Sequence, residues 1–486
     1  MTKKSLVVLA ALLCLALLPM AARAEDPIVL HINEGSIVIS SDTYSVGGVW
    51  PVPYTPGTEF VIGGETKEHT IIVSDRVTAN IMLYWVKIDL SGKDMCAFNI
   101  GNGATVNLTL PRGPENEIKS GGANAGIHVP EGATLNIIGE GSLEVHGGTG
   151  GGAGIGGSFG EGAGKITIGK GIDLDPVVEA YGGGGGAGIG GGANGGGGQI
   201  IINGHWIEAR GGNSGGAGIG CGAGGSGGTI TLNMGILNTY CGGEDGAAID
   251  GERIIINGGA VAVNYRGRGS ASKIGINGKE VIFTGGSLEA HGTDRAFADG
   301  VDFTPPLACL YWIENESFGE DWKSFPEAGT TFPAIGDKKY VGIVGRPSQP
   351  QNVVAVPGYE KATVTFAPPA RDGDNKILHY TVYIYSTDDP DVPADGIKLE
   401  GEEGATAIVV TGLKNGFKYT FKVAANARLA GIVSPLSEPS NIVTPGDPSE
   451  ENSGSGGCNA GAGGLILLAL FFMFVHKQKR TKALSL

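Results

Sequence analysis

Cysteine is scarce in this sequence, and the few cysteines do not fall into metal-binding pairs. Only six of the 486 residues are cysteine, and no two of them stand in a C-x-x-C spacing. That spacing is typical of zinc and thiol-redox sites, so the sequence predicts neither. The histidines also lack metal-ligand spacing; the isolated ones are His128, His146, His205 and His291.

Basic residues are few as well, and seven of them lie in the two end segments of the chain. The chain has 34 Lys and Arg against 49 Asp and Glu. Near the start, Lys3 and Lys4 precede an apolar run at residues 6–18, and an A-x-A cleavage site ends at Ala24. This order is typical of a secretory signal peptide, which we predict at residues 1–24.

The exported chain is strongly acidic. Without the seven basic residues of the two end segments, 27 basic residues remain against 49 acidic ones, a net charge of −22. Such a charge opposes binding to nucleic acid or directly to anionic lipid. We therefore expect no nucleic-acid partner and a surface domain of the cell envelope, secreted through the general export pathway.

Glycine, by contrast, is abundant, with 89 residues, and it recurs in phase with isoleucine. A phrase such as GAGIGG returns with one apolar residue at its centre. Successive copies are 29, 28, 34, 30 and 30 residues apart, and their central residues are Phe98, Ile127, Ile155, Ile189, Ile219 and Ile249. A repeat of this length indicates a solenoid or a propeller. No G-K-[ST] follows these phrases, so they are not nucleotide-binding loops.

Each period contains three short segments, and those that flank the phrase alternate apolar and polar residues like β-strands. A propeller blade needs four antiparallel strands, which such a period does not hold. The sequence predicts an all-β fold, a right-handed parallel β-helix with three sides. The alternative is a disordered glycine-rich tract, which phased Ile and Val argue against. The predicted inward residues are Ile166/Ile168, Ile200/Ile202, Ile230/Leu232, Ile254/Ile256, Leu143/Val145, Val178/Ala180, Ile207/Ala209, Leu237/Thr239, Val261/Val263 and Leu288/Ala290.

The regular coils are predicted over residues 94–302. Residues 25–93 are interpreted as an N-terminal cap and the first coils, because the end of a solenoid must be covered. After the last regular copy, the next central residue is expected at Ile274 and the final phrase at Ala296. Residues 303–345 lack the phrase and are rich in aromatics, which indicates a C-terminal cap; the alternative is an exposed aromatic binding site.

Residues 346–447 form a different module of short alternating strands, typical of a β-sandwich. Tyr419 stands at the position of a tyrosine corner, and Phe366 precedes a pair of prolines. Further motif residues are Pro350, Pro368-Pro369, Tyr380, Gly412-Leu413, Ala424-Ala425-Asn426 and Pro439-Ser440-Asn441. On these residues the whole module resembles the fibronectin type III family, whose members usually carry Trp where Phe366 stands. The resemblance implies a spacer or interaction module, and because no Arg-Gly-Asp triplet occurs, integrin-type recognition is not expected.

The C-terminal end has the order of a processing signal. Residues 448–457 are typical of a flexible linker, and residues 458–486 join a small-residue motif, a short apolar run and a basic tail. The SGGCNAG phrase resembles the Synergist-type C-terminal sorting signals of bacterial exported proteins. The resemblance implies an envelope processing enzyme as partner, acting at or near Cys458, Asn459 and Gly461. The alternative is a plain transmembrane helix as tail anchor, although the apolar run is shorter than the roughly 20 residues of a full span; in both cases this segment brings the chain to the membrane.

Two cysteines of the exported body, Cys221 and Cys241, lie less than one period apart. An oxidising compartment permits a disulfide between them. Two buried free thiols are the equal alternative.

The outward positions of the third predicted strand form the candidate binding surface. Stacking would align these positions into columns about 4.8 Å apart from coil to coil. The candidates are Glu144, Glu179 and Glu208 in one column, His146, Tyr181, Arg210 and Tyr240 in the next, and Trp206 at the head of a strand. Aromatic rings stack on the C–H faces of sugars, and carboxylates accept hydrogen bonds from hydroxyls. We therefore predict a face for glycan binding or adhesion, with a polysaccharide or a cell-surface glycan as partner.

Stacked glutamates repel each other by roughly 1 kcal/mol or more per pair, unless Arg210 or a cation relieves them. Ca²⁺ is therefore the one cofactor that the sequence leaves open, and no metal ligand is assigned. The alternative interpretation is that these residues are ordinary solvated positions of a repeat. The protein is then a passive structural stalk or coat.

An enzyme is the third function class, because many β-helix proteins that these coils resemble cleave polysaccharides. A glycosidase needs two carboxylates about 5 to 10 Å apart, and a lyase needs clustered acids with a nearby base. The notable acids in the predicted loops form no compact set with a base; they are Asp173, Asp175, Asp245, Asp250 and Glu252. We assign no catalytic residue and do not expect an enzyme.

Overall fold

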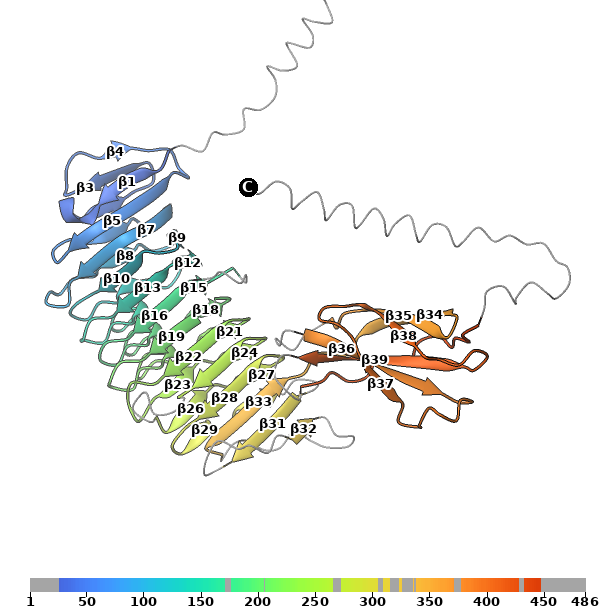
Figure 1. Cartoon of the computed structure of the whole chain (residues 1–486). Coiled ribbons are helices and arrows are strands. Elements are labelled where there is room, and N and C mark those ends of the chain that lie inside the picture. Colours follow the sequence, from blue (N-terminus) through green and yellow to red (C-terminus); the bar gives the residue numbers. More distant parts are fainter. Residues whose placement is uncertain are drawn as a thin grey trace, which may run out of the picture.

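The computed structural model of the chain describes residues 26–170, 176–204, 206–264, 272–304, 309–314, 323–325, 335, 338–370, 377–427 and 432–446. Within these ranges the protein is all-β, and the only helical turn is η1 (Ile32–Glu34). Two units follow each other along the chain: a long stack of strands, here called the strand stack (residues 26–345), and a smaller sandwich (Figure 1).

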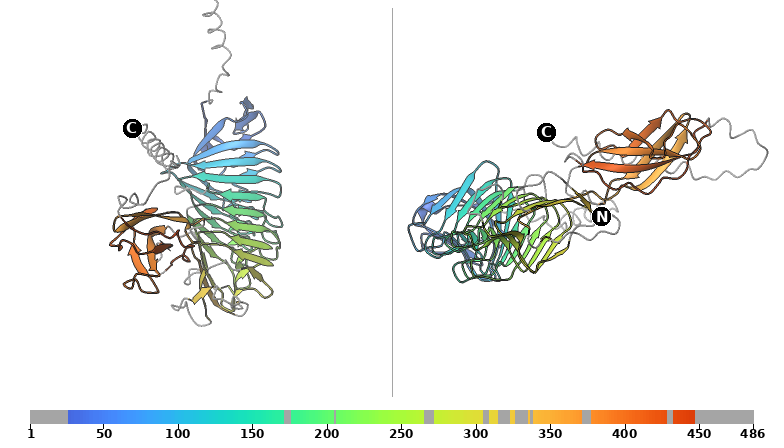
Figure 2. Two further views of the ribbon diagram at one scale, coloured as in Figure 1. Left: turned by 90° about the vertical axis from the view of Figure 1, so that its right-hand side faces the viewer. Right: turned by 90° about the horizontal axis from the view of Figure 1, so that it is seen from below.

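The larger sheet of the strand stack has 21 strands and contains two parallel series. In each series a strand pairs in register with the corresponding strand of the next coil, one above another in Figure 2. The first series consists of β1 (Ile28–His31), β5 (Glu59–Thr66), β7 (Thr78–Asp89), β9 (Thr105–Leu110), β12 (Thr134–Gly139), β15 (Lys165–Ile168), β18 (Gln199–Ile202), β21 (Thr229–Leu232), β24 (Arg253–Ile256), β27 (Glu280–Phe283) and β30 (Asp302–Thr304). The second series starts on the last residues of β7 and continues through β10 (Glu115–Lys119), β13 (Ser142–His146), β16 (Val177–Tyr181), β19 (Trp206–Arg210), β22 (Ile236–Tyr240), β25 (Ala260–Val263) and β28 (Ser287–His291).

A second sheet of 12 strands carries the glycine phrases as a third series. Its parallel strands are β2 (Ile37–Ile39), β6 (Ile71–Val73), β8 (Phe98–Ile100), β11 (Ile127–His128), β14 (Ile155–Gly156), β17 (Ile189–Gly190), β20 (Ile219–Gly220), β23 (Ala247–Asp250), β26 (Ile274–Asn277) and β29 (Arg295–Phe297). Two short strands, β3 (Thr43–Val46) and β4 (Val52–Pro53), add antiparallel pairing at the edge of β2.

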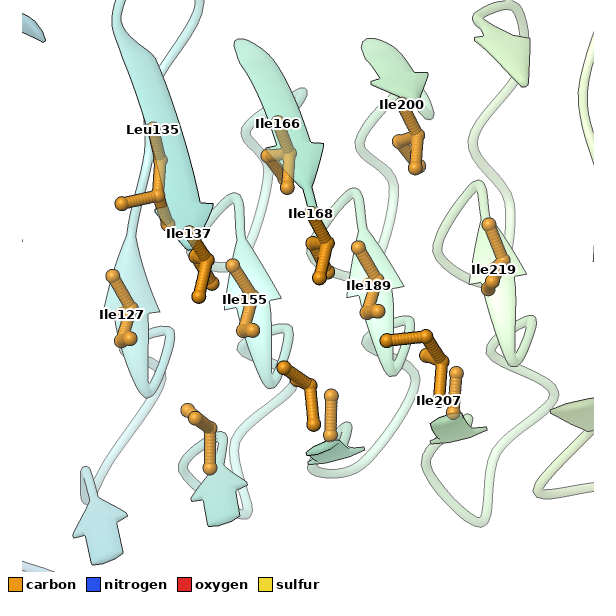
Figure 3. Packing of buried hydrophobic residues seen from close by; sticks show 14 of the residues in the cluster. Ile127, Leu135, Ile137, Ile155, Ile166, Ile168, Ile189, Ile200, Ile207 and Ile219 are labelled. Carbon is orange, nitrogen blue, oxygen red and sulfur yellow. The ribbon is translucent and has the colours of Figure 1, made fainter. Parts of the chain in front are cut away.

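The central residues of the phrases lie directly opposite one another. Ile155 pairs with Ile189, and Ile189 with Ile219, so their side chains form a row inside the stack (Figure 3). The expected next residue of this row was wrong: Ile276, not Ile274, lies opposite Ile249. Ile274 lies two residues earlier on the same strand, opposite Ala247. The expected and the observed residue therefore belong to the same face of the strand, because side chains alternate with a period of two.

The inward residues of all three series form one continuous apolar core. In β16, for example, Val178 and Ala180 are fully buried, while Val177, Glu179 and Tyr181 are partly exposed. Every predicted inward residue of the first and second series is buried. One of them is polar, and the hydroxyl of Thr239 is satisfied because it donates to the carbonyl oxygen of Ala248 at 2.7 Å.

The glycine directly after the central isoleucine of the phrase is required by close packing between coils. Gly190 has φ +136°, and a Cβ atom there would lie 1.9 Å from the carbonyl oxygen of Gly220. Gly156 and Gly220 meet the next coil in the same way. A side chain at these positions would therefore separate neighbouring coils, which is why the sequence repeats glycine and not merely a small residue.

Cys96, Cys221 and Cys241 are free thiols. Cys221 and Cys241 are buried and form no disulfide. Each thiol donates to a carbonyl oxygen of its own loop, Cys221 to Gly227 at 3.0 Å and Cys241 to Gly243 at 3.1 Å. Burial raises the pKa of the Cys221 thiol to about 12, so it is held protonated and unreactive.

The parallel order of the stack ends at antiparallel strands. β33 (Tyr340–Gly345) pairs antiparallel with β28 of the second series and with β31 (Cys309–Glu314), and β32 (Lys323–Phe325) pairs with β31. Most of the aromatic segment that we interpret as a C-terminal cap lies outside the described residues.

The sandwich consists of two three-stranded antiparallel sheets. One contains β34 (Gln351–Gly358), β35 (Lys361–Ala367) and β38 (Ala407–Thr411), and the other contains β36 (Ile377–Ser386), β37 (Ile397–Glu400) and β39 (Tyr419–Ala427). The two sheets enclose a separate apolar core, in which the rings of Phe366 and Tyr380 lie 4.7 Å apart.

Candidate binding face

The outward residues of the second series form a column of carboxylates. Glu117 of β10 lies opposite Glu144 of β13, which lies opposite Glu179 of β16 and, in turn, Glu208 of β19. We call these four residues the acid column. Lys87 of β7 precedes them, and Asn238 of β22 follows them. The register of the strands therefore aligns the predicted glutamates and adds Glu117, which the sequence analysis did not single out.

Each carboxylate of the acid column has a hydrogen-bonding partner two residues later in its own strand. His146 Nε2 lies 2.6 Å from Glu144 Oε1, and Tyr181 donates its hydroxyl to Glu179 Oε2 at 2.7 Å. Arg210 Nη2 donates to Glu208 Oε1 at 3.3 Å. Lys119 forms the equivalent ion pair with Glu117. We call Lys119, His146, Tyr181 and Arg210 the donor column.

This arrangement raises the pKa values of two residues of the donor column, Tyr181 and Lys119. The pKa of Tyr181 is raised, first because burial disfavours the phenolate and then because the hydroxyl donates to Glu179. The pKa of Lys119 is raised chiefly by its hydrogen bond to Glu117. Tyr181 is therefore a neutral donor and Lys119 a positive one. The partner of Glu179 thus contributes no positive charge to the face, unlike the partner of Glu117.

Rings of the donor column stack along the axis of the stack. The rings of His146 and Tyr181 lie 4.7 Å apart and nearly parallel, and the Arg210 guanidinium lies 5.1 Å from the ring centre of Tyr240. Tyr240 itself is only 4% exposed. The interpretation of Tyr240 as an open platform for a sugar is thereby corrected: its ring supports Arg210 and has no free face.

A column of mostly apolar residues borders the acid column on its other side. Trp206 lies opposite Val177 on one side and Ile236 on the other. Trp206 and Val177 are partly exposed, and Ile236 is 46% exposed. Ala260 and Ser142 continue the same column, which we call the apolar column. The face therefore has an apolar stripe, a carboxylate stripe and a donor stripe side by side.

A hollow of about 310 Å³ opens on this face where the second series begins. It is lined by Lys87, Glu115, Asn116, Glu117, Ser142, Leu143, Glu144, Val177 and Glu179. A larger hollow, of about 450 Å³, lies elsewhere, over glycine backbone near Glu131 and Lys165. We give the smaller hollow more weight, because it contains the charged groups of the acid column and the larger one is mainly backbone.

The sequence analysis missed two aromatic residues on β7, the strand that contributes Lys87 to the smaller hollow. Tyr84 and Trp85, adjacent on β7, are each 50% exposed. Their signal was present in the sequence, because the alternation of residues 82–90 breaks at these two neighbours. Two successive outward residues in a strand indicate a bulge.

The acids and histidines that the sequence analysis considered for catalysis or metal binding do not form a compact cluster among the described residues. Among the described residues, no group of three or more His, Cys, Asp or Glu is placed to hold a metal ion. Asp245 pairs with Lys273, and Glu252 with Lys279. Asp250 accepts a hydrogen bond from Asn277, and burial raises its pKa to about 6. Asp173, Asp175 and His205 lie outside the described residues.

The predicted processing residues also lie outside the described ranges; they are Ala24, Cys458, Asn459 and Gly461. Across the ranges that the structure does describe, none of the residues builds a helix with the length and apolar character needed to cross a bilayer.

The sandwich shows the geometry of a tyrosine corner. The Tyr419 hydroxyl donates to Asp389 Oδ2 at 2.6 Å and accepts from the backbone N–H of Lys414 at 3.0 Å. Residues 348–443 match the fibronectin type III domain family. This module is a fibronectin type III domain. The expectation from the sequence is confirmed for this part of the chain.

Segments of several solved structures are similar to part of this chain. The FN5 domain of Drosophila Lar is 26% identical over 21% of this chain and 98% of that chain, with a TM-score of 0.17. Titin module A71 from human cardiac muscle is 27% identical over 20% of this chain and 90% of its own, with a TM-score of 0.17. The structure of the titin kinase and its flanking domains is 26% identical over 21% of this chain; the match spans 18% of that structure, with a TM-score of 0.18. No curated protein matches this chain.

Proposed function

We propose that this protein is an exported component of the cell envelope whose strand stack, a right-handed three-sided parallel β-helix, binds a glycan on the face of the second series. The fibronectin type III domain, a module typical of surface or structural proteins, then acts as a spacer or as a second interaction site. The observation that carries the proposal is the alignment of the apolar, acid and donor columns over successive coils.

The chemistry of the face supports a glycan better than a compact ligand. A sugar ring presents an apolar C–H face and a rim of hydroxyls, and the apolar column can contact the first while the acid column accepts hydrogen bonds from the second. Both columns repeat once per coil, so they suit a ligand that itself repeats. Trp206 and Glu208 stand side by side in this arrangement, on the same strand.

A passive stalk or coat is the second candidate, and one observation favours it. Every member of the acid column already has a partner in its own strand. Such pairing stabilises the face without any ligand, and repeats produce it at each coil. A polysaccharide lyase or glycosidase remains the least favoured class, since it needs a compact set of acids with a base.

The two end segments of the chain belong to the same proposal. We propose that residues 1–24 direct export and that residues 458–486 bring the chain to the membrane, where an envelope processing enzyme acts near Cys458. Ca²⁺ between carboxylates of the acid column stays an open part of the proposal.

A glycan array probed with the full chain, with and without Ca²⁺, tests the glycan-binding function. We expect binding that weakens about tenfold in Trp206→Ala, the loss of about 1.4 kcal/mol of stacking and burial. Phe159→Ala is the matched control, because Phe159 is 53% exposed and lies outside the second series. Absence of binding to any glycan, in either condition, favours the passive stalk.

A further inference from the structure

We propose that the hollow at the start of the second series is the end subsite of a groove for an extended chain of amino sugars, closed at one end by Trp85. This inference rests on the proposed glycan-binding function and names the class of glycan. It adds Trp85 and Lys87, which lie outside the columns predicted from the sequence.

Trp85 holds the position in β7 that Trp206 holds in β19. It stands two residues before Lys87, which lies opposite Glu117, just as Trp206 stands two residues before Glu208. Extending the register two residues back from the Lys87–Glu117 pair places Trp85 beside Glu115, at the head of the apolar column. This position is four coils before Trp206, a distance of about 19 Å at one strand spacing per coil. Glu115, Ser142 and Val177 occupy the positions between them.

The backbone turns Trp85 outward by a bulge. Gly63 of β5 lies opposite Tyr84, and Gly64 lies opposite Val86, so Trp85 is the extra residue. Its φ is +59°, a left-handed conformation that is rare for an aromatic residue. A bulge redirects the side chain at its extra residue, and Trp85 is 50% exposed in consequence.

A buried side chain of the hollow fixes this bulge. Asn116 is only 2% exposed, although its counterpart in the next strand is the apolar Leu143. Its Oδ1 accepts from the backbone N–H of Val86 at 3.0 Å, and its Nδ2 donates to the carbonyl oxygen of Ser142 at 3.2 Å. Asn116 thus links the bulge to the wall of the hollow, so the indole and the hollow keep a fixed relation.

The size and shape of the hollow fit a sugar residue. Its volume of about 310 Å³ lies at the low end for small-molecule sites. The small side chains of Ser142 and Val177 form part of its lining between the two tryptophans. A chain lying along the apolar column can therefore sink into the hollow and contact an indole at each end.

The charges around the hollow select the class of sugar. Four carboxylates, Glu115, Glu117, Glu144 and Glu179, line it together with one ammonium group, that of Lys87. Lys119 is paired with Glu117. A uronic acid in this place would be repelled, while a protonated amine is attracted and finds carboxylate acceptors. We therefore assign glucosamine-type units to the groove.

Calorimetric titration of the full chain with glucosamine oligomers of three and six units tests this assignment. The N-acetylated oligomers of the same lengths are the control for charge, because they differ only in the amine. We expect the deacetylated hexamer to bind at least tenfold more tightly than its acetylated counterpart and than the deacetylated trimer, since only the longer chain reaches both tryptophans.

Substitutions of Trp85 test whether the end subsite contributes to binding separately from the rest of the face. Trp85→Ala is expected to weaken hexamer binding about tenfold, while Trp85→Phe, which keeps a ring, retains most of the affinity. Trp50→Ala is the matched control, because Trp50 is 91% exposed and precedes β4, away from the second series. Glu117→Gln and Glu144→Gln should reduce the preference for the free amine.

Each adverse result is informative. Equal affinity for acetylated and deacetylated hexamers overturns the assignment of amino sugars, and unchanged hexamer binding in Trp85→Ala overturns the end subsite. If glucosamine oligomers do not bind while another glycan binds and is lost in Trp206→Ala, this inference fails and the proposed function stands. If no glycan binds the chain at all, both fail.

Discussion

At the scale of single residues, the acid column explains how like charges can stack one coil apart. From the sequence alone, Arg210 or a cation was the expected relief of repulsion between the glutamates. The structure instead gives Glu144, Glu179 and Glu208 a separate donor each, two residues further along the same strand. Local pairing of this kind survives the screening that weakens attraction to more distant charges.

The glycine of the repeated phrase gives a direct test of coil packing. Gly190→Ala is expected to lower the free energy of unfolding by about 3 kcal/mol, because it adds a clash with the Gly220 carbonyl to the cost of a positive φ. Gly132→Ala is the control: Gly132 also has a positive φ, +84°, but its Cβ would have no neighbour within 4 Å. Urea unfolding measures both. Equal losses in the two variants would mean that backbone strain alone, not contact between coils, requires glycine at position 190.

Acid should lower the free energy of unfolding of the fibronectin type III domain by protonating the carboxylate of Asp389. Hydrogen bonds from Lys414 and then from Tyr419 lower the pKa of Asp389 to about 2, whereas an aspartate of an unfolded chain titrates near pH 4. A lowered pKa contributes stability that is complete above about pH 4 and is lost as the pH falls towards 2. Unfolding of the domain followed between pH 5 and pH 2 checks this. Asp389→Asn should flatten the dependence, and an unchanged slope in that variant would assign it to other groups.

At the scale of elements, the last segment of the sandwich pairs without being a regular strand. Ser434, Ser437 and Ser440 recur every three residues, and their backbone N–H groups donate to Ala425, Val423 and Phe421 of β39. Their hydroxyl oxygens in turn accept from the backbone N–H groups of the same three residues, at 2.9 to 3.0 Å. The serines recur every three residues, whereas the residues of β39 that bond to them recur every two. The segment can still pair with β39, because the serine hydroxyl oxygens accept the hydrogen bonds that backbone carbonyls accept in a regular sheet.

Removing one of these hydroxyls should leave a buried donor without a partner. Ser437 is 3% exposed, and its Oγ accepts from Val423 N at 2.9 Å. Ser437→Ala is expected to cost about 2 kcal/mol of unfolding free energy, the usual penalty for an unsatisfied buried N–H. Thr411→Ala, at an exposed end of β38, is the control. A loss below about 0.5 kcal/mol, typical of surface substitutions, would indicate that water takes the place of the hydroxyl.

The contrast between regular and irregular elements shows what the sequence could predict. The alternating runs of the second series, such as Val177 to Tyr181, predicted both the inward residues and the aligned columns, because a parallel register follows from a strict repeat. The burial of the Tyr240 ring and the bulge at Trp85 could not be predicted in the same way. Both depend on contacts between coils, the guanidinium of Arg210 in the first case and the amide of Asn116 in the second, and these contacts leave no periodic signal.

At the scale of the whole molecule, the described residues of the strand stack and of the fibronectin type III domain share a small apolar contact. Val344 at the end of β33 forms a three-residue cluster with Ala427 and Ile432 of the sandwich. Arg346, the first residue of the sandwich module, donates from Nε to the carbonyl oxygen of Val433 within that module at 2.8 Å. The large apolar cores of the two units are separate clusters. The three-residue contact is thus small beside the core of either unit.

Two separate cores with a small contact should unfold in two steps. Calorimetry of the full chain is expected to show two transitions, and residues 346–447 produced alone should melt within about 5 °C of the matching transition, the shift that roughly 1 kcal/mol causes in a domain of this size. Val344→Ala should bring this transition of the full chain to the melting temperature of the isolated domain, because it removes the apolar side chain of the stack that packs against Ala427 and Ile432. A single merged transition, or an isolated domain that is unfolded at room temperature, would mean that the stack stabilises the sandwich directly and that the pair forms one cooperative unit.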